Sequence, residues 1–173
     1  MAEQVILVDE FDNELGLMEK MEAHEKGLLH RAFSVFVLNA EGEIMMQQRA
    51  FHKYHSGGLW TNTCCSHPRQ GEKNEDAAHR RLQEEMGFDC YLEKQFTFVY
   101  RAELDKGMTE HEFDHLFVGY YSGIPQINTD EVNAWKWMSI EDLERDMSVN
   151  PDDYTEWFKI IFNRFVDSVA QDK

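Results

Sequence analysis

The stretch Glu72-Lys-Asn-Glu-Asp-Ala-Ala-His-Arg-Arg-Leu-Gln-Glu-Glu-Met-Gly-Phe88 places a loop glutamate in front of a helical pattern. Its apolar residues recur four positions apart, as on one face of a helix: Ala78, Leu82 and Met86. Asn74 is a candidate N-cap, and Gly87 is a typical residue for the end of a helix. The stretch therefore predicts a short amphipathic helix that follows an acidic loop.

The C-terminal half of this helix carries an acidic pair, Glu84-Glu85, and Arg81 lies four residues before Glu85 on the same face. Carboxylates gathered at one helix end can hold Mg²⁺, which prefers oxygen ligands and often bridges to phosphate. The alternative is a solvated helix with ion pairs between successive turns. On residue types alone, the solvated helix is the more common case.

Strand-like and helix-like segments alternate along the rest of the chain. The apolar run 32–38 predicts a buried strand, which turns at 39–42 into a hairpin partner at 43–49. Alternating apolar residues predict further strands around Phe96–Tyr100, within 110–121 and at 134–138. Helices are expected at 18–26, after a capping-box pattern at Ser139 and Asp142, and over 154–169, where apolar residues follow a three-four spacing. This order favours an α/β/α sandwich around a mixed sheet.

The composition narrows the class of protein. A chain of 173 residues fits one domain, here taken as 1–173. With 33 acidic and 17 basic residues, its formal net charge of −16 disfavours nucleic acid and anionic membranes as partners. Three cysteines, two of them adjacent, make a poor disulfide framework, and no secretory signal opens the chain. We expect a cytoplasmic protein.

The loop Asn62-Thr-Cys-Cys-Ser-His-Pro68 carries a candidate reactive centre, because Cys65 lies two residues from His67. A thiol can act as an acid or a base when its neighbours tune its pKa. The alternative is a buried structural cysteine, which is the more common fate of this residue type. We expect that structural role for Cys64.

A second acidic pair, Glu110 and Glu112, falls on a predicted strand, where the period of two places both side chains on one face. Two neighbouring carboxylates repel each other unless a proton or a cation lies between them. Three histidines elsewhere in the chain, His24, His30 and His67, would complete a set of ligands suited to Mn²⁺, Zn²⁺ or Mg²⁺. Spacing alone does not bring these five residues together.

The first stretch resembles the Nudix box of enzymes that act on diphosphate-linked compounds. The matching residues are Glu72, Arg80, Leu82, Glu84, Glu85, Gly87 and Phe88. Two positions depart from the pattern, because Ser66 replaces the opening Gly and Arg81 replaces the first helical Glu. The loss of one metal-binding carboxylate argues against ordinary Nudix hydrolysis.

The cysteine loop is similar to the active-site loop of the type I isopentenyl-diphosphate isomerases, whose modified Nudix box has the same departures. This resemblance runs from about Val5 to the last helix. It implies that His24, His30, His67, Glu110 and Glu112 bind one metal, and that Glu85 contacts a Mg²⁺ held with a diphosphate. It further implies diphosphate binding by Lys20, Arg49, Lys53 and Arg81.

The resemblance also implies a reaction in isoprenoid biosynthesis, the interconversion of isopentenyl and dimethylallyl diphosphate through a tertiary carbocation. Cys65 and Glu112 would move the two protons, with Tyr100 assisting near Glu112. Trp157, otherwise a core residue of the last helix, would stabilise the cation with its indole face. Which of the two acids protonates the substrate stays open.

Two other functions compete with this hypothesis. A Nudix hydrolase of a nucleoside diphosphate derivative would depend on Glu84 or Glu85 and not on Cys65. A binding module for a phosphorylated ligand would bind without turnover. We expect no flavin, and a monomer or a weak homodimer.

Overall fold

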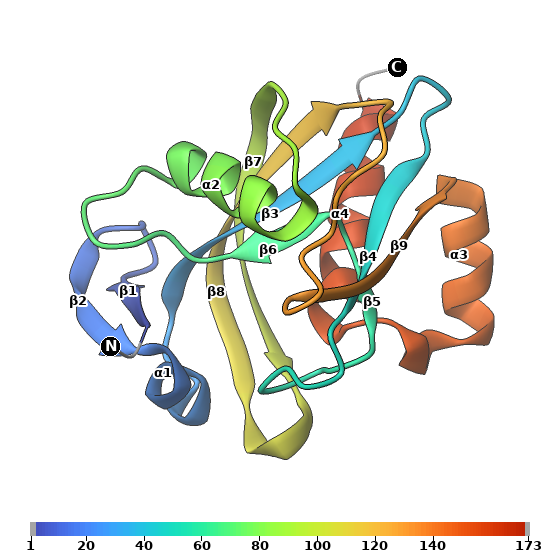
Figure 1. Ribbon diagram of the computed structural model, residues 1–173. Helices are drawn as coiled ribbons and strands as arrows, with labels where there is room; N and C mark the ends of the chain where they lie inside the picture. The colour runs from blue at the N-terminus through green and yellow to red at the C-terminus, as the bar shows by residue number, and fades with distance from the viewer. Residues whose placement is uncertain (1–2, 172–173) are drawn as a thin grey trace.

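The computed structural model describes residues 3–171, which form one mixed sheet covered by helices on both faces (Figure 1). Its strands are β1 (Gln4–Val8), β2 (Glu14–Glu19), β3 (His30–Leu38), β4 (Ile44–Arg49), β5 (Trp60–Thr61), β6 (Cys64–Ser66), β7 (Leu92–Glu103), β8 (Thr109–Tyr120) and β9 (Val132–Met138). The predicted α/β sandwich around a mixed sheet is therefore confirmed.

Strand β3 lies at the centre of the sheet and pairs with four other strands along its length. It runs parallel to β8 over nine residue pairs, from His30↔Glu112 to Leu38↔Tyr120. On its other side it pairs in turn with β1, β6 and β4, all antiparallel. Strand β8 continues the sheet to β7, and β4 continues it to β9 and β5. The ends of β3 and β8 therefore lie side by side.

The helices divide between the two faces of the sheet. They are α1 (Lys20–Lys26), α2 (Asn74–Met86), α3 (Ile140–Val149) and α4 (Glu156–Gln171), with 3₁₀ turns η1 (Asp105–Gly107) and η2 (Pro151–Asp153). Helix α2 lies in front of the sheet in Figure 1, and α4 lies behind it. Among residues 3–171, no helix combines the length and the apolar character needed to cross a membrane.

The alternation of β3 explains the two cores. Phe36 and Leu38 point toward α4 and join a cluster with Phe158, Phe162 and Phe165. The residues that alternate with them, Val35 and Val37, join a second cluster under α2. Because successive side chains of a strand point to opposite faces, the apolar run at the end of β3 is buried between two helical layers.

Several predicted boundaries need correction. Asn74 does not cap α2: it is the first helical residue, and the N-cap is Lys73, which makes no side-chain capping bond. The helix expected from Met18 begins at Lys20, because residues 14–19 pair with β1 as a strand. Tyr154 precedes α4 and forms a bridge with Trp60. Ser139, in contrast, caps α3 as expected, accepting a hydrogen bond from the Asp142 amide.

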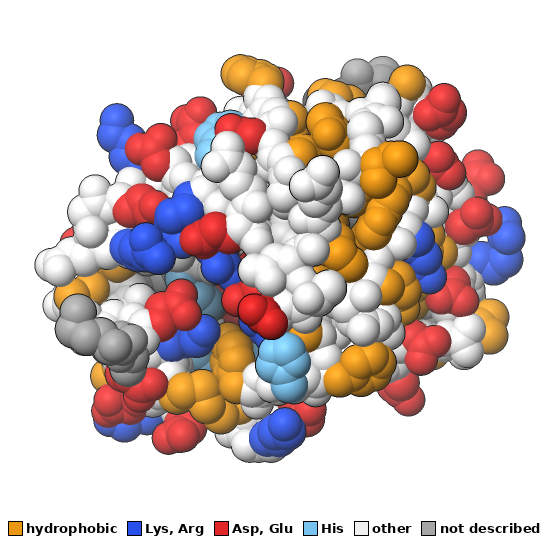
Figure 2. Space-filling model, viewed as in Figure 1, with side chains coloured by type: hydrophobic (Ala, Val, Ile, Leu, Met, Phe, Trp, Pro, Cys, Tyr) orange, Lys and Arg blue, Asp and Glu red, His pale blue; other side chains and the backbone are white. Residues whose placement is uncertain are grey.

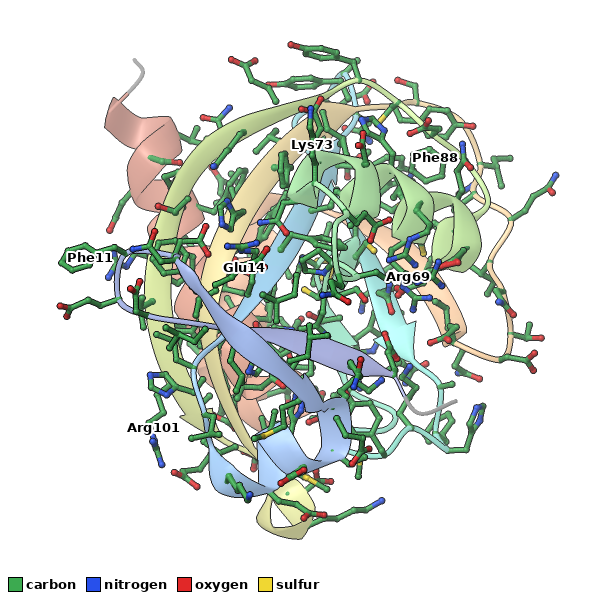
Figure 3. The ribbon with its side chains drawn as sticks, turned by 90° about the vertical axis from the view of Figure 1, so that its left-hand side faces the viewer. Phe11, Glu14, Arg69, Lys73, Phe88 and Arg101 are labelled. Atoms are coloured by element: carbon green, nitrogen blue, oxygen red, sulfur yellow. The ribbon has the colours of Figure 1, made fainter. Side chains whose placement is uncertain are left out.

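The β1–β2 hairpin crosses the sheet on the side of α2, as Figure 3 shows with Glu14 on β2 and Lys73 at the start of α2. A carboxylate in the hairpin turn holds it there. Asp12, at φ 67, accepts hydrogen bonds from Arg31 Nε at 2.7 Å and from His115 Nε2 at 2.9 Å. The hairpin carries α1 at its end, so this anchor also positions α1.

The α4 core should be sensitive to truncation. The Phe165 ring stacks on Phe36 with centroids 4.5 Å apart and is 1% exposed. We expect Phe165→Ala to lower the free energy of unfolding by about 3–5 kcal/mol, since it leaves a cavity. Phe11→Ala, at a residue 74% exposed, should change it by less than about 0.5 kcal/mol. Urea denaturation measures both, and equal effects would contradict the assignment of the core.

Candidate active site

The acidic pair lies where β3 and β8 run side by side. Glu110 and Glu112 are 5% and 6% exposed, and both point to the same face of β8 as the spacing predicts. The parallel register sets His30, the first residue of β3, directly beside Glu112. Its Nε2 lies 3.4 Å from Glu112 Oε2. The strand pairing thus brings together residues 82 positions apart in the chain.

Two more imidazoles close over this pair. His24 comes from α1, and its Nε2 contacts Glu110. His67 follows β6, and its Nε2 lies 3.0 Å from Glu112 Oε2. All three histidine rings lie within 5.0–5.8 Å of one another, centroid to centroid. The ligand atoms of His24, His30, His67 and Glu110 fall within 4.8 Å of one another.

The chemistry of these donors suits a metal ion. The Nδ1 atoms of His24 and His30 donate hydrogen bonds to the carbonyls of Lys20 and Leu28, at 2.7 and 2.9 Å. A carbonyl only accepts, so each neutral ring turns the lone pair of Nε2 toward the carboxylates. Within the described residues, His30 Nε2 has no hydrogen-bond partner although it is buried. The cluster therefore has the donors that a divalent cation needs.

Burial sets the protonation of the two acids. It raises the pKa of Glu110 well above its ordinary value. Burial acts in the same direction on Glu112, but the neighbouring Glu110, His30 and His67 side chains outweigh it and hold the pKa of Glu112 well below its ordinary value. The carboxylates therefore favour a shared proton or a cation between them. Tyr100 lies opposite Glu112 in the β7–β8 ladder and donates its hydroxyl to Glu112 Oε1.

Cys65 lies on β6, across from Ser34 on β3. Its Sγ is 3.2 Å from Asn62 Oδ1 and 3.6 Å from Ser34 Oγ. The Asn62 amide nitrogen donates to two backbone carbonyls, which leaves Oδ1 facing the thiol. Burial raises the pKa of Cys65 well above its ordinary value. Cys64, in contrast, is fully buried in the core under α2, as expected for a structural cysteine.

A narrow cavity joins the thiol to the acidic pair. Cys65, Glu112 and Trp157 all line it. Trp157 lies at the start of α4 and is 3% exposed, yet its Nε1 has no hydrogen-bond partner among the described residues. The guanidinium carbon of Arg49 lies 5.0 Å from the Trp157 ring centroid. The indole therefore borders the site as well as the core.

A second, polar cavity adjoins the first, and four cations line it together with Glu85: Lys20, Arg49, Lys53 and Arg81. Three of them pair with carboxylates, as in Lys20–Glu3 at 2.8 Å, Lys53–Glu131 at 2.5 Å and Arg81–Glu85 at 2.6 Å. Cys65 and His67 line this cavity too. Figure 2 shows basic and acidic side chains around a hollow beside α2. The structure thus brings together the four predicted cations and places them beside the thiol.

Comparison with known proteins agrees with this geometry. Residues 28–158 match the NUDIX domain family. The chain is 52% identical to "Isopentenyl-diphosphate Delta-isomerase 2" of Aromatoleum aromaticum, over 96% of this chain and 88% of that one. It is 51% identical to "Isopentenyl-diphosphate Delta-isomerase" of Pectobacterium atrosepticum, over 95% and 92%. The chain belongs to the isopentenyl-diphosphate Delta-isomerase family of NUDIX proteins.

More distant structures share the fold. The Deinococcus radiodurans protein DR0079 superposes with a TM-score of 0.79 at 16% identity, over 94% of this chain and 98% of that one. A MutT protein from Methanosarcina mazei superposes with a TM-score of 0.65, over 80% and 94%, also at 16% identity. At such identities the likeness concerns the fold alone.

The structure explains how this isomerase family member keeps a Nudix helix with an altered box. Glu72 binds Arg80 through two hydrogen bonds, at 2.8 and 2.9 Å, and so ties the loop to α2. Arg81, where the box has a glutamate, turns to Glu85 and lines the polar cavity. The position that would supply one more carboxylate supplies a cation instead. Glu84 is exposed and pairs with both arginines.

His55 also belongs to this site, although no pattern in the sequence singled it out. It is 2% exposed, lies on the loop after β4 and lines the cavity with Glu110 and Trp157. Two other histidines outside the expected ligand set have partners elsewhere in the structure. His79 pairs with Asp89, and His111 bonds to the Gly27 carbonyl, both away from the cavity. No spacing rule separates His55 from these, because only the path of its loop turns it inward.

Burial of His55 should make stability depend on pH. Burial and the nearby Arg49 charge lower its pKa from 6.5 to about 2. The unfolded chain therefore binds this proton at a higher pH than the folded protein, and stability falls as the pH falls below 6.5. With a chelator present, wild type should lose about 2 kcal/mol more than His55→Phe between about pH 7 and 5. Urea unfolding at both pH values measures this, and parallel losses would contradict it.

Proposed function

We propose that this protein interconverts isopentenyl diphosphate and dimethylallyl diphosphate for isoprenoid biosynthesis. One observation carries the proposal: Cys65, Glu112 and Trp157 line one narrow cavity, and a cation-lined cavity opens beside it. Double-bond transposition needs two proton-handling groups next to the same carbon skeleton. Names of relatives at 51–52% identity point to the same reaction.

In the proposed mechanism, a proton adds to the terminal alkene carbon and forms a tertiary cation. A proton then leaves the neighbouring carbon on the other side, so the double bond moves and the atoms balance. Cys65 and Glu112 are the two proton-handling groups, and Tyr100, hydrogen-bonded to Glu112, shares in the transfer there. Trp157 places its ring beside the cation, which an indole face stabilises.

The diphosphate would bind in the polar cavity. Arginine offers phosphate a fork of donors, and lysine offers a compact charge. Arg49 lines both cavities, so it links the place of the diphosphate to the place of the reacting carbons. Glu85, at the edge of the same cavity, is the residue we expect to contact a Mg²⁺ carried by the diphosphate.

We further propose a metal in the cluster of His24, His30, His67, Glu110 and Glu112. Mn²⁺, Zn²⁺ and Mg²⁺ are the candidates that this set of donors suits. When bound, a divalent cation would hold the two carboxylates together and favour their ionised forms. The residues themselves keep the cluster buried, and the hydrogen bonds at Nδ1 of His24 and His30 orient the rings.

We infer that the whole chain acts as one domain, since both cores share β3. We also infer a cytoplasmic setting, because Cys64, Cys65 and Cys90 are all free thiols and the proposed chemistry needs a reduced Cys65. A monomer or a weak homodimer is sufficient, because one chain supplies all the proposed residues.

The proposed chemistry predicts deuterium incorporation. We expect purified protein with isopentenyl diphosphate and Mg²⁺ in deuterated water to yield deuterated allylic product, followed by proton NMR. Cys65→Ala and Glu112→Gln should each lower kcat by about 10²–10⁴-fold, since each removes a proton-handling group. Cys64→Ala is the matched control in the same loop. No product from a folded, metal-loaded protein would favour the hydrolase alternative, tested with nucleoside diphosphate compounds.

Trp157 should act on the chemical step. Trp157→Leu keeps an apolar side chain but removes the π face, so we expect kcat to fall about 30-fold, from a loss of about 2 kcal/mol. Trp157→Phe should keep part of the rate, and KM should change little in both variants because the cations stay in place. Steady-state kinetics separates these effects. Equal kcat values for the two variants would assign Trp157 to the core only.

A further inference from the structure

His55 carries a buried polar atom that the proposed mechanism does not use. Its Nε2 has no hydrogen-bond partner within the part of the chain that the structure describes. Buried ring nitrogens in folded proteins nearly always have a partner, so an unpaired one points to an interaction that completes the site. An acceptor lies close by: Glu110 Oε1 is 3.7 Å from His55 Nε2.

The position of the His55 ring relates it to the metal cluster. Its centroid lies 5.5 Å from that of His24, the same spacing as among the three histidines of the cluster. The Glu110 oxygen that His55 faces is also the oxygen that contacts His24 Nε2. His55 therefore approaches the one carboxylate of the pair that His30 and His67 do not contact directly.

The loop that carries His55 is built to turn it inward. Ser56, the next residue, has a left-handed backbone with φ 54, which is rare outside glycine. Asp105 Oδ1 accepts the Ser56 amide at 2.9 Å, and Arg49 donates to the His55 carbonyl at 3.1 Å. Asp105 lies in η1, the turn between β7 and β8. The same hairpin that carries Glu110 thus also fixes the loop of His55.

The contact of His55 Nδ1 with a hydroxyl is compatible with a neutral ring that carries its proton on Nε2. Nδ1 of His55 lies 3.1 Å from Ser56 Oγ. A serine hydroxyl that donates to Nδ1 leaves the proton of the neutral ring on Nε2, which then points its N–H at the Glu110 carboxylate. On its other side the ring meets Trp157 edge to face, with centroids 5.5 Å apart. The ring is therefore held between Trp157 and Glu110.

We propose that His55 is a positioning residue of the metal centre, which donates from Nε2 to Glu110 and holds that carboxylate in place as a ligand. It acts through Glu110 and does not itself bind the metal. This inference rests on the metal-binding part of the proposed function and not on the isomerase reaction. Partners of this kind typically change metal affinity by about 10–100-fold when they are removed.

The test measures Zn²⁺ affinity of the metal-stripped protein by competition with a chromophoric chelator. His55→Leu should bind Zn²⁺ about 10–100-fold more weakly than wild type, because Glu110 loses its donor. His55→Gln, whose amide N–H takes the place of Nε2, should stay within a few-fold of wild type. The matched control is His52→Leu, at an exposed histidine of the same loop, which should change nothing.

Each contrary result overturns the inference. Wild-type affinity in folded His55→Leu shows that the ring only fills space, and equal losses in His55→Leu and His55→Gln exclude a hydrogen-bond role. If His55→Leu does not fold, Asp105→Ala releases the loop instead, and unchanged affinity in that variant overturns the inference. A wild-type protein that binds no Zn²⁺ removes the metal proposal as well, whereas isomerase activity is judged separately by NMR.

Discussion

The site depends on burying two carboxylates side by side at the junction of β3 and β8. Such a pair is unfavourable in a protein interior unless positive charge or hydrogen-bond donors surround it. Three imidazoles that could hold a cation beside the pair come from different elements: His30 from β3, His24 from α1 and His67 from the end of β6. The arrangement of strands around β3 therefore brings these metal-ligating side chains together.

The same constraint organises the neighbouring residues. Strand β6 pairs with β3 for three residues only, which is enough to place Cys65 opposite Ser34 and to deliver His67 to the acidic pair. The β7–β8 ladder sets Tyr100 against Glu112. The pairing of β3 with β6 and with β8 thus sets the positions of Cys65 and Glu112, the two proposed proton-handling groups. A shift of β3 relative to these strands would change both positions.

The two cavities differ in how many cations line them. A chain with a net charge of −16 needs local cations to attract an anionic substrate. Four cations from α1, β4, the loop after it and α2 meet in one cavity, with Glu3, Glu85 and Glu131 as counter-ions. In the proposed reaction, the reacting carbons would lie in the adjoining cavity beside Trp157. If these cations bind a diphosphate as proposed, an acidic protein can attract a small anion to one cavity.

The sequence by itself determined the elements whose pattern is local. The apolar run of β3, the helical spacing of α2 and α4, and the shared face of Glu110 and Glu112 all follow from periods of 2 and 3.6 residues. The resemblance to the isomerase family further identified His24 and His30 as candidate metal ligands. Only the tertiary structure decided what depends on pairing between distant segments. Strand β2, half of whose residues are exposed, pairs with β1, and β6 is a three-residue strand that pairs with β3. His55 is turned inward by a left-handed Ser56 that Asp105 holds from another hairpin, an interaction across 49 residues that no local pattern contains.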